Sequence, residues 1–172
     1  MLVNIKFLLL PALIIFTCLF IHDGVYAAEV GSVDTKFNLL SPDDSIKIEV
    51  VKDPKIEGVV CYLSSAQKGG YRGALGIAED TSDASIDCRQ IGPIQFIKPF
   101  KKGESVFKER RSLIFKKLKV VRFCDISNNA IVYLVYSERV IEGSPKNSVS
   151  AVPVSKWHTQ KDDELLEMCS YK

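Results

Sequence analysis

Apolar and polar residues alternate along most of the chain, and this period of two constrains the fold more than any other feature. In SIKIEVVK, Ile46, Ile48 and Val50 alternate with Ser45, Lys47 and Glu49. Side chains of a β-strand point alternately to the two faces of its sheet, so this pattern predicts a half-buried strand. The same reasoning predicts further strands at residues 58–64 and 85–91, with a continuation at 94–97 past a bend at Gly92-Pro93.

Two longer β-rich runs flank an Asn-rich turn and predict a hairpin. They cover residues 111–126 and 130–140, on either side of Ser127-Asn128-Asn129. The second run is apolar on both faces, which indicates a central strand of its sheet. A last strand is expected at residues 148–154. Its Pro153 cannot donate a ladder hydrogen bond, so this strand should end at an edge.

Only the C-terminal tail has helical features. Thr159 precedes acidic residues where a helix dipole favours them, and Leu165 and Cys169 would share one helical face. The expected fold is therefore mainly β, in the β-rich α+β class. We expect one antiparallel-sheet or barrel-like domain over residues 28–158, followed by a short C-terminal helix in a tail over residues 159–172.

The N-terminus has the features of a secretory signal peptide. Lys6 precedes the apolar run Phe7–Ile21, and Val25 and Ala27 occupy the small-residue positions of a cleavage site. The run is shorter than the roughly 20 residues that a membrane-spanning helix needs. We expect residues 1–27 to be removed, a periplasmic location and no membrane span in the mature chain. An uncleaved N-terminal anchor is the alternative.

Four cysteines follow the expected cleavage site: Cys61, Cys88, Cys124 and Cys169. An even number in an exported chain favours disulfides, with three possible connectivities. A Cys61–Cys88 bond would close a Gly-rich polar loop between two predicted strands. A Cys124–Cys169 bond would attach the tail to the sheet, and two free buried thiols are the alternative for this second pair.

The motifs argue against several classes of function. The Gly-rich segment 69–76 lacks the spacing of dinucleotide and P-loop fingerprints, and the acidic segment 79–87 lacks that of an EF-hand. The cysteine spacings do not fit zinc templates. We therefore expect no metal and no cofactor. The net charge of +2 gives no basis for general nucleic-acid binding. No catalytic residue is assigned, because the nucleophile elbow and the HExxH motif are both absent.

If a ligand site exists, it is expected where GGYRGALGIAED (69–80) meets SERVIEGSPKN (137–147). An aromatic ring there offers a stacking surface, two arginines offer cations to an anion, and carboxylates can orient a polar group. In the alternative, Arg72 pairs with Glu79 or Asp80 on the loop surface. The candidate ligand-binding residues are Tyr71, Arg72, Glu79, Asp80, Arg139 and Glu142.

Residues 98–122 hold ten basic side chains against only two acidic ones. A strand face of that charge would suit an anionic partner, such as an envelope component or an acidic periplasmic protein. The alternative is a solvated edge hairpin whose lysines prevent edge-to-edge pairing.

Four segments resemble the CreA family of bacterial periplasmic proteins, and the similarity runs from about Glu29 to Trp157. They are GSVDT (31–35), GIAEDTSDASIDCRQIGPI (76–94), FKKLKVVRF (115–123) and YLVYSERVIEGSPKNSVSAVPV (133–154). The resemblance implies a periplasmic location and cysteines that match Cys61 and Cys88. It implies no activity and no catalytic residues. Cys124 and the tail Thr159–Lys172 depart from the family pattern. A single added tail, held by a Cys124–Cys169 bond, would account for both departures.

These observations favour a non-enzymatic binding or accessory module of the cell envelope. One alternative is a small hydrolase that acts on envelope polymer through Glu79, Asp80 or Glu142. A second alternative is a structural protein that binds a partner through the basic segment 98–122.

Overall fold

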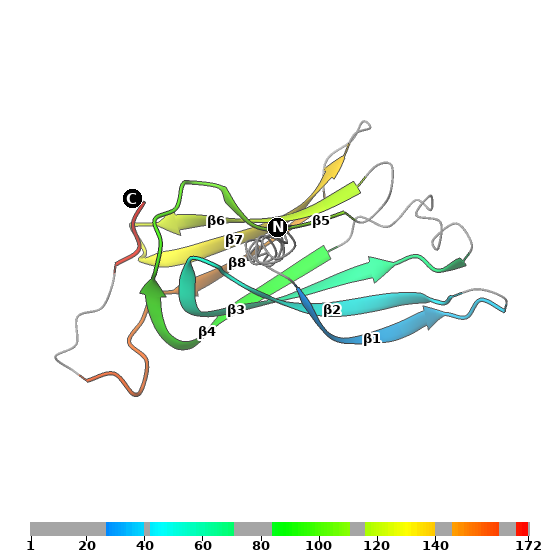
Figure 1. The fold of residues 1–172 in the computed structure, drawn as a ribbon, viewed down its shortest axis with the longest axis horizontal. Helices are drawn as coiled ribbons and strands as arrows, with labels where there is room; N and C mark the ends of the chain where they lie inside the picture. The colour runs from blue at the N-terminus through cyan, green and yellow to red at the C-terminus, as the bar shows by residue number, and fades with distance from the viewer. Residues whose placement is uncertain are drawn as a thin grey trace, which may run out of the picture.

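The computed structural model describes residues 27–39, 42–70, 84–110, 116–139, 146–161 and 168–171. Eight strands form two four-stranded antiparallel sheets, in the orders β1-β2-β3-β4 and β5-β6-β7-β8 (Figure 1). The strands are β1 (Ala28–Lys36), β2 (Asp44–Lys52), β3 (Ile56–Gln67), β4 (Ala84–Phe96), β5 (Glu104–Arg110), β6 (Lys116–Asp125), β7 (Ala130–Arg139) and β8 (Asn147–Pro153).

The two sheets pack as the layers of a sandwich and do not close into a barrel. Their edge strands β4 and β8 run side by side in one direction (Figure 1). The Cys88 N–H donates to Ser150 Oγ at 2.8 Å, and Gln90 Nε2 donates to the Ser155 carbonyl at 2.9 Å. The two edges are thus joined by hydrogen bonds between side chains and backbone. In a closed barrel they would be joined by a ladder of backbone hydrogen bonds. The expectation of an antiparallel sheet is confirmed, and that of a barrel-like closure is wrong.

The core lies between the inner faces of the two sheets. On β7, Ile131, Tyr133 and Val135 are all fully buried. They face Val51 and Leu63 of the other sheet, which are also within the core cluster. The strand β7 lies between β6 and β8, and Pro153 is the last residue of the edge strand β8, so both positions predicted from the sequence are confirmed.

Two strands escaped the sequence analysis, β1 and β5. The strand β1 is an edge strand whose residues are almost all exposed, so its sequence carries no alternation. In β5, Val106 and Phe107 are adjacent and both buried. A register shift between Ser105 and Phe107 makes this possible, because a bulge breaks the period of two.

The bend expected at Gly92-Pro93 is a bulge within one continuous strand, β4. The register of β3 and β4 shifts between Glu57 and Val59. Gly58 lies there with a φ of 78°, and a Cβ at this position would collide with the Pro93 carbonyl. Glycine is therefore required, both for the backbone angle and for the close approach of β4.

The described residues contain no helix. The predicted tail helix is therefore not shown: residues 168–171 have no regular structure, and Leu165 lies outside the described part of the chain. The segment 1–26 lies outside it as well. No helix long and apolar enough to cross a bilayer is found in the ranges that the structure describes.

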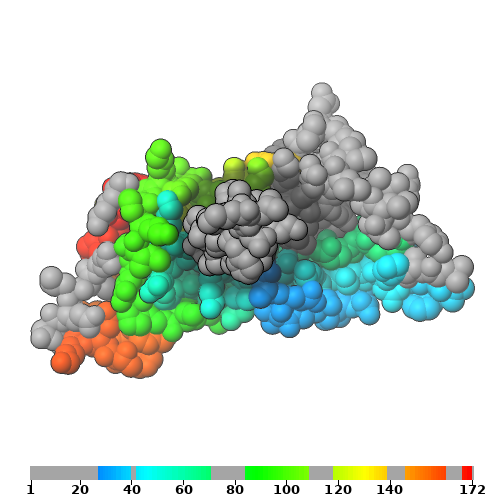
Figure 2. All heavy atoms as spheres, viewed as in Figure 1, coloured from blue at the N-terminus to red at the C-terminus, as the bar shows by residue number. Residues whose placement is uncertain are grey.

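The sandwich has two ends, which differ in chemistry. We call the tail end the one that holds the β2–β3 turn, residues 97–103, the β6–β7 turn and residues 168–171. Figure 2 shows the 168–171 segment in red against green residues at this end. We call the loop end the opposite one, where β3 and β7 end and β4 and β8 begin (Figure 1).

Candidate functional site at the loop end

Both cysteine pairs favoured by the sequence lie at disulfide distance. Cys61 and Cys88 are directly opposite in the β3–β4 register, with Sγ atoms 2.07 Å apart. Cys124 of β6 pairs with Cys169 of the tail, with Sγ atoms 2.15 Å apart. All four side chains are buried. The first pair cross-links two neighbouring strands, and the second fixes the tail to the sheet.

The predicted ligand-binding residues are mostly outside the described part of the chain. This holds for Tyr71, Arg72, Glu79, Asp80 and Glu142, and Arg139 is placed only by its backbone as the last residue of β7. The strand ends that flank both segments are described. They meet at the loop end, where β3 ends at Gln67 and β8 begins at Asn147.

The interior of the sandwich becomes polar toward the loop end. Glu49 and Ser65 on one sheet and Ser137 on the other are 2%, 5% and 3% exposed. The Oγ atoms of Ser65 and Ser137, together with Gln67 Nε2, are buried with no hydrogen-bond partner among the described residues. An unsatisfied buried polar group costs about 1–3 kcal/mol, and most such atoms in proteins are paired. Three such atoms lie toward the loop end, where they are buried and unpaired in the described part of the chain.

A hollow of about 420 Å³ opens at the loop end, and we call it the serine hollow. The hydroxyls of Ser64 and Ser85 lie 2.9 Å apart in a hydrogen bond. The Ser137 N–H donates to the Lys146 carbonyl, so Ser137 lies next to the lining. The described lining residues include no carboxylate; they are Ile46, Ser64, Ser65, Ala66, Ala84, Ser85, Lys146 and Asn147.

A second hollow, of about 340 Å³, lies at the same end, and we call it the ion-pair hollow. Its Lys47 Nζ is 2.9 Å from Glu49 Oε1 and 3.5 Å from Glu29 Oε2. The hydrogen bond from the Gly69 N–H lowers the pKa of Asp44, which also pairs with Lys68. The lysines here are thus already bound by carboxylates. The described lining is Glu29, Ser32, Pro42, Asp43, Ser45, Lys47, Gln67, Lys68 and Gly69.

The tail end holds a buried charge cluster that the sequence analysis missed. The Arg122 guanidinium is fully buried, and its Nη1 forms an ion pair with Asp53 Oδ1. The Tyr133 hydroxyl donates to Asp53 Oδ2 at 3.1 Å, and burial raises the pKa of Tyr133 well above 10. Asp53 lies in the β2–β3 turn, whereas Arg122 and Tyr133 belong to β6 and β7. The cluster therefore bridges the two sheets.

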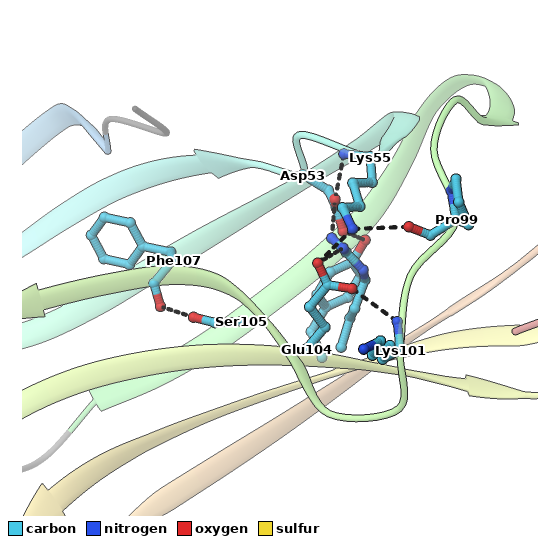
Figure 3. Close-up of polar contacts among 9 residues, drawn as sticks. Asp53, Lys55, Pro99, Lys101, Glu104, Ser105 and Phe107 are labelled. Carbon is cyan, nitrogen blue, oxygen red and sulfur yellow. Dashed lines mark hydrogen bonds and ion pairs between the residues drawn. The ribbon is translucent and has the colours of Figure 1, made fainter. Parts of the chain in front are cut away.

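A second layer of polar contacts surrounds this pair (Figure 3). Lys55 Nζ lies 2.6 Å from Glu104 Oε1 and donates to the Pro99 carbonyl. The Lys101 N–H donates to Glu104 Oε2 at 2.8 Å. The hydrogen bond from Lys55 is the main cause of the lowered pKa of Glu104. These contacts fix the 97–103 connection over the buried pair.

Arg122 was counted with the exposed basic segment 98–122, and this was wrong. Its side chain points inward, as those of Leu118 and Val120 do. The spacing of two residues from these apolar positions could have indicated this direction from the sequence. Lys108 and Lys119 both contact Glu138, at 3.7 and 3.5 Å. The described basic residues of the segment therefore do not form one cationic face.

Metal ligation finds no support in the ranges that the structure describes, since they hold no group of three or more His, Cys, Asp or Glu side chains suited to an ion. The carboxylates of the proposed hydrolase, Glu79, Asp80 and Glu142, lie outside those ranges.

Comparisons with known proteins give a consistent assignment. Residues 30–157 match the family model described as CreA protein. Protein CreA of Escherichia coli strain K12 is 54% identical over 136 residues, which cover 77% of this chain and 87% of the relative. Proteins of the same name from strains CFT073 and O157:H7 match to the same extent. No solved structure matches the chain. The family match includes the serine hollow and the buried ion pair but ends before Cys169.

Proposed function

The chain belongs to the CreA family, and from this premise we propose that it is a non-enzymatic binding or accessory module of the bacterial cell envelope. Its binding site is the loop end of the sandwich. The signal-like N-terminus supports export to the periplasm with cleavage after Ala27, and the two cysteine pairs suit an oxidising compartment. The working domain is then residues 28–158, with residues 159–172 as an attached tail.

One observation carries the proposal: Ser65 is only 5% exposed, yet its hydroxyl has no hydrogen-bond partner among the described residues, at the end where both candidate segments start. Folded proteins pair nearly all of their buried polar groups. An unpaired buried group therefore calls for an explanation, and binding of a molecule at this end is the one that we propose. The six candidate residues of the flanking segments, Arg72 and Arg139 among them, would complete this site.

The test is a chemical-shift titration of the ¹⁵N-labelled protein, purified from cells that express the full chain. Soluble fractions of a bacterial envelope are the added material. We expect shifts at the strand ends near Ser65, Ala84 and Asn147, and none at Asp53 or Glu104 of the tail end. Shifts confined to the tail end, or none from any fraction, would refute a loop-end binding site.

The location is tested separately. N-terminal sequencing of the protein from fractionated cells should give Ala28 as the first residue, in the periplasmic fraction. An intact N-terminus in the membrane fraction would instead support the uncleaved anchor.

A further inference from the structure

We propose that the outer face of the β1–β4 sheet docks against the same face of a second copy of this chain. The outer face is formed by the side chains of this sheet that point away from the core. The inference goes beyond the binding function proposed above and does not depend on it. The apolar members of the outer face are Val33, Ile46, Ile48, Val50, Tyr62 and Ala66.

The strand β2 places its aliphatic side chains mostly on the outside. Ile46 and Ile48 are 43% and 38% exposed, whereas Glu49 between the core and these residues is 2% exposed and points inward with Val51. The β5–β8 sheet packs on the inner side of this layer (Figure 1). The solvated face of an antiparallel sheet usually carries polar residues. Here it carries exposed aliphatic ones, which indicates a surface that is covered by a partner.

The exposed apolar side chains are continuous across three neighbouring strands. Ile46 lies opposite both Val33 of β1 and Ala66 of β3. Val50 lies opposite Tyr62 of β3. Directly opposite residues share a face, with Cβ atoms about 5 Å apart, so these side chains are neighbours. Val33 is 65% and Tyr62 38% exposed. They therefore form one patch rather than scattered single residues.

The polar groups of the outer face are paired with one another. The hydroxyls of Ser64 and Ser85 share a hydrogen bond of 2.9 Å. Asp87 and Arg89 form an ion pair on the edge strand β4, with 61% and 62% of their side chains exposed. The Arg89 guanidinium also lies 5.9 Å from the centroid of the Tyr62 ring. An apolar centre with charged groups at its margin is the arrangement of a protein–protein interface.

Charge favours a second copy as the occupant. The ion pair of Asp87 and Arg89 is neutral in sum, and at the opposite margin Lys36 lies opposite Asp44 in the β1–β2 register. Two identical faces therefore meet without net repulsion, and a two-fold axis can bring unlike charges together. The carboxylates at both margins disfavour an anionic lipid surface, which attracts basic segments.

The size of the outer face suits a weak, reversible dimer. The strands β1 and β2 each have nine residues. At about 3.3 Å per residue and about 4.8 Å between strands, four strands of this length present a face of roughly 570 Å². Two copies would cover roughly 1,100 Å² in total, slightly above the lower limit of about 1,000 Å² for a specific interface. The shapes also match, because sheets pack face to face about 10 Å apart.

The test measures self-association of the full chain, purified from cells that express it, with no envelope material added. Sedimentation equilibrium between about 10 µM and about 1 mM should show a monomer–dimer equilibrium with a Kd on the order of 100 µM. Amide shifts of the ¹⁵N-labelled protein should change with concentration at Val33, Ile48 and Tyr62. A monomer at every concentration, or concentration-dependent shifts confined to the other sheet, would overturn the inference.

Two exposed valines provide a matched pair of variants. Val33 and Val149 are 65% and 63% exposed, and they lie on the edge strands β1 and β8 of different sheets. Val33→Asp places a carboxylate in both halves of the dimer and should weaken association at least about tenfold. Val149→Asp should leave the association unchanged, and equal effects of the two variants would contradict the assigned surface.

A milder variant protects the test against misfolding. Ile48→Thr keeps a β-branched side chain, which strands favour, and removes apolar surface from the centre of the outer face. It should weaken association at least about threefold. Thermal unfolding, measured at a concentration where the chain is monomeric, checks that each variant retains its fold. Unchanged association of a folded Ile48→Thr would count against the outer face.

The occupant and the loop-end function are tested separately. Vesicles of phosphatidylethanolamine and phosphatidylglycerol are added to the monomeric protein. If vesicles shift the outer face but concentration does not, the partner is a lipid surface and the second copy is wrong. Ile46, Ser64 and Ser85 also line the serine hollow, so envelope fractions are titrated into monomeric protein as well. Loop-end binding without self-association refutes only the dimer, and self-association without loop-end binding refutes only the proposed function.

Discussion

The two ends of the sandwich solve the problem of buried polar groups in opposite ways. At the tail end, Asp53 accepts hydrogen bonds from Tyr133 and from the Lys55 backbone while it pairs with Arg122. At the loop end, Ser65 and Ser137 are buried to a similar degree but have no partner among the described residues. The two ends therefore differ in how their buried polar groups are paired, although the degree of burial is similar.

The tail end is not perfectly paired either, and the exception is informative. Arg122 Nε and Nη2 have no hydrogen-bond acceptor among the described residues. However, Nη2 lies 3.5 Å from Glu104 Oε1, and the guanidinium lies 4.7 Å from the centroid of the Phe100 ring. Charge and an aromatic face thus compensate for the missing bonds. The Ser65 hydroxyl has no hydrogen-bond partner in the described structure.

The largest effect is expected where the buried pair is broken. Asp53→Asn leaves the Arg122 charge inside the protein without its counter-ion, and such losses cost about 3–5 kcal/mol. Urea unfolding measures this change. Asp87→Asn is the matched control, because Asp87 pairs with Arg89 on the surface with 61% of its side chain exposed. The control should lose less than about 1 kcal/mol. Similar losses for both variants would mean that the buried pair is not important for stability.

The next effect concerns the tail. The double variant Cys124→Ala/Cys169→Ala should lose roughly 2–4 kcal/mol by urea unfolding, because the disulfide restricts the unfolded chain. Tyr171 should also detach, because it lies two residues after Cys169. It would then lose the hydrogen bond of its hydroxyl to the Cys124 backbone and the edge-on contact of its ring with Phe100. Detachment is measured by fluorescence quenching of tyrosine. The loop end should be unaffected, so a change in the loop-end chemical shifts caused by envelope fractions would contradict the separation of the two ends.

A smaller effect should appear as a pH dependence. The lowered pKa of Glu104 in the folded state, caused first by Lys55, means that its contribution is complete above its ordinary pKa of 4.5. The contribution is lost as the pH falls through the lowered folded pKa. Unfolding free energies measured between about pH 6 and about pH 3 should fall less steeply in Glu104→Gln than in the parent. Identical slopes would exclude Glu104 as a source of acid sensitivity.

The sequence revealed the parts of the fold in which one face is buried and the other is not. The alternation of Ile46, Ile48 and Val50 with Lys47 and Glu49 predicted β2, and a strand is found there, but its faces are inverted. Ile46 and Ile48 are 43% and 38% exposed, whereas Glu49 is 2% exposed. The same rule fails for β1, which is too exposed to alternate, and for β5, in which a bulge shifts the phase. Barrel closure could not be judged, because it depends on whether the edges of β4 and β8 pair by backbone or by side chains.

The candidate site was predictable only in its position along the chain. Segments around Arg72 and Arg139 were chosen for composition, and the structure brings their flanking strand ends together at the loop end. Ser65 and Ser137 were missed, although each continues the alternation of the buried residues of its own strand. Arg122 was assigned to the exposed basic segment because of its charge. Its alternation with Leu118 and Val120 indicated instead that its side chain points inward.

The smallest expected change in stability gives the sharpest test of the comparison between the ends. Ser65→Ala removes a buried hydroxyl that has no partner in the described structure, so no hydrogen bond is lost. The free energy of unfolding should stay the same or rise by up to about 1 kcal/mol. Tyr133→Phe removes a buried hydroxyl that is bonded to Asp53 and should lose about 1–2 kcal/mol.

This pair of variants distinguishes groups kept for binding from groups kept for stability. A gain in stability together with smaller loop-end chemical shifts on addition of envelope fractions in Ser65→Ala is the trade-off expected of a binding residue. A loss as large as that of Tyr133→Phe would show that the Ser65 hydroxyl is held within the folded protein itself. The two ends would then differ only in polarity, and the loop end would no longer stand out as the binding site.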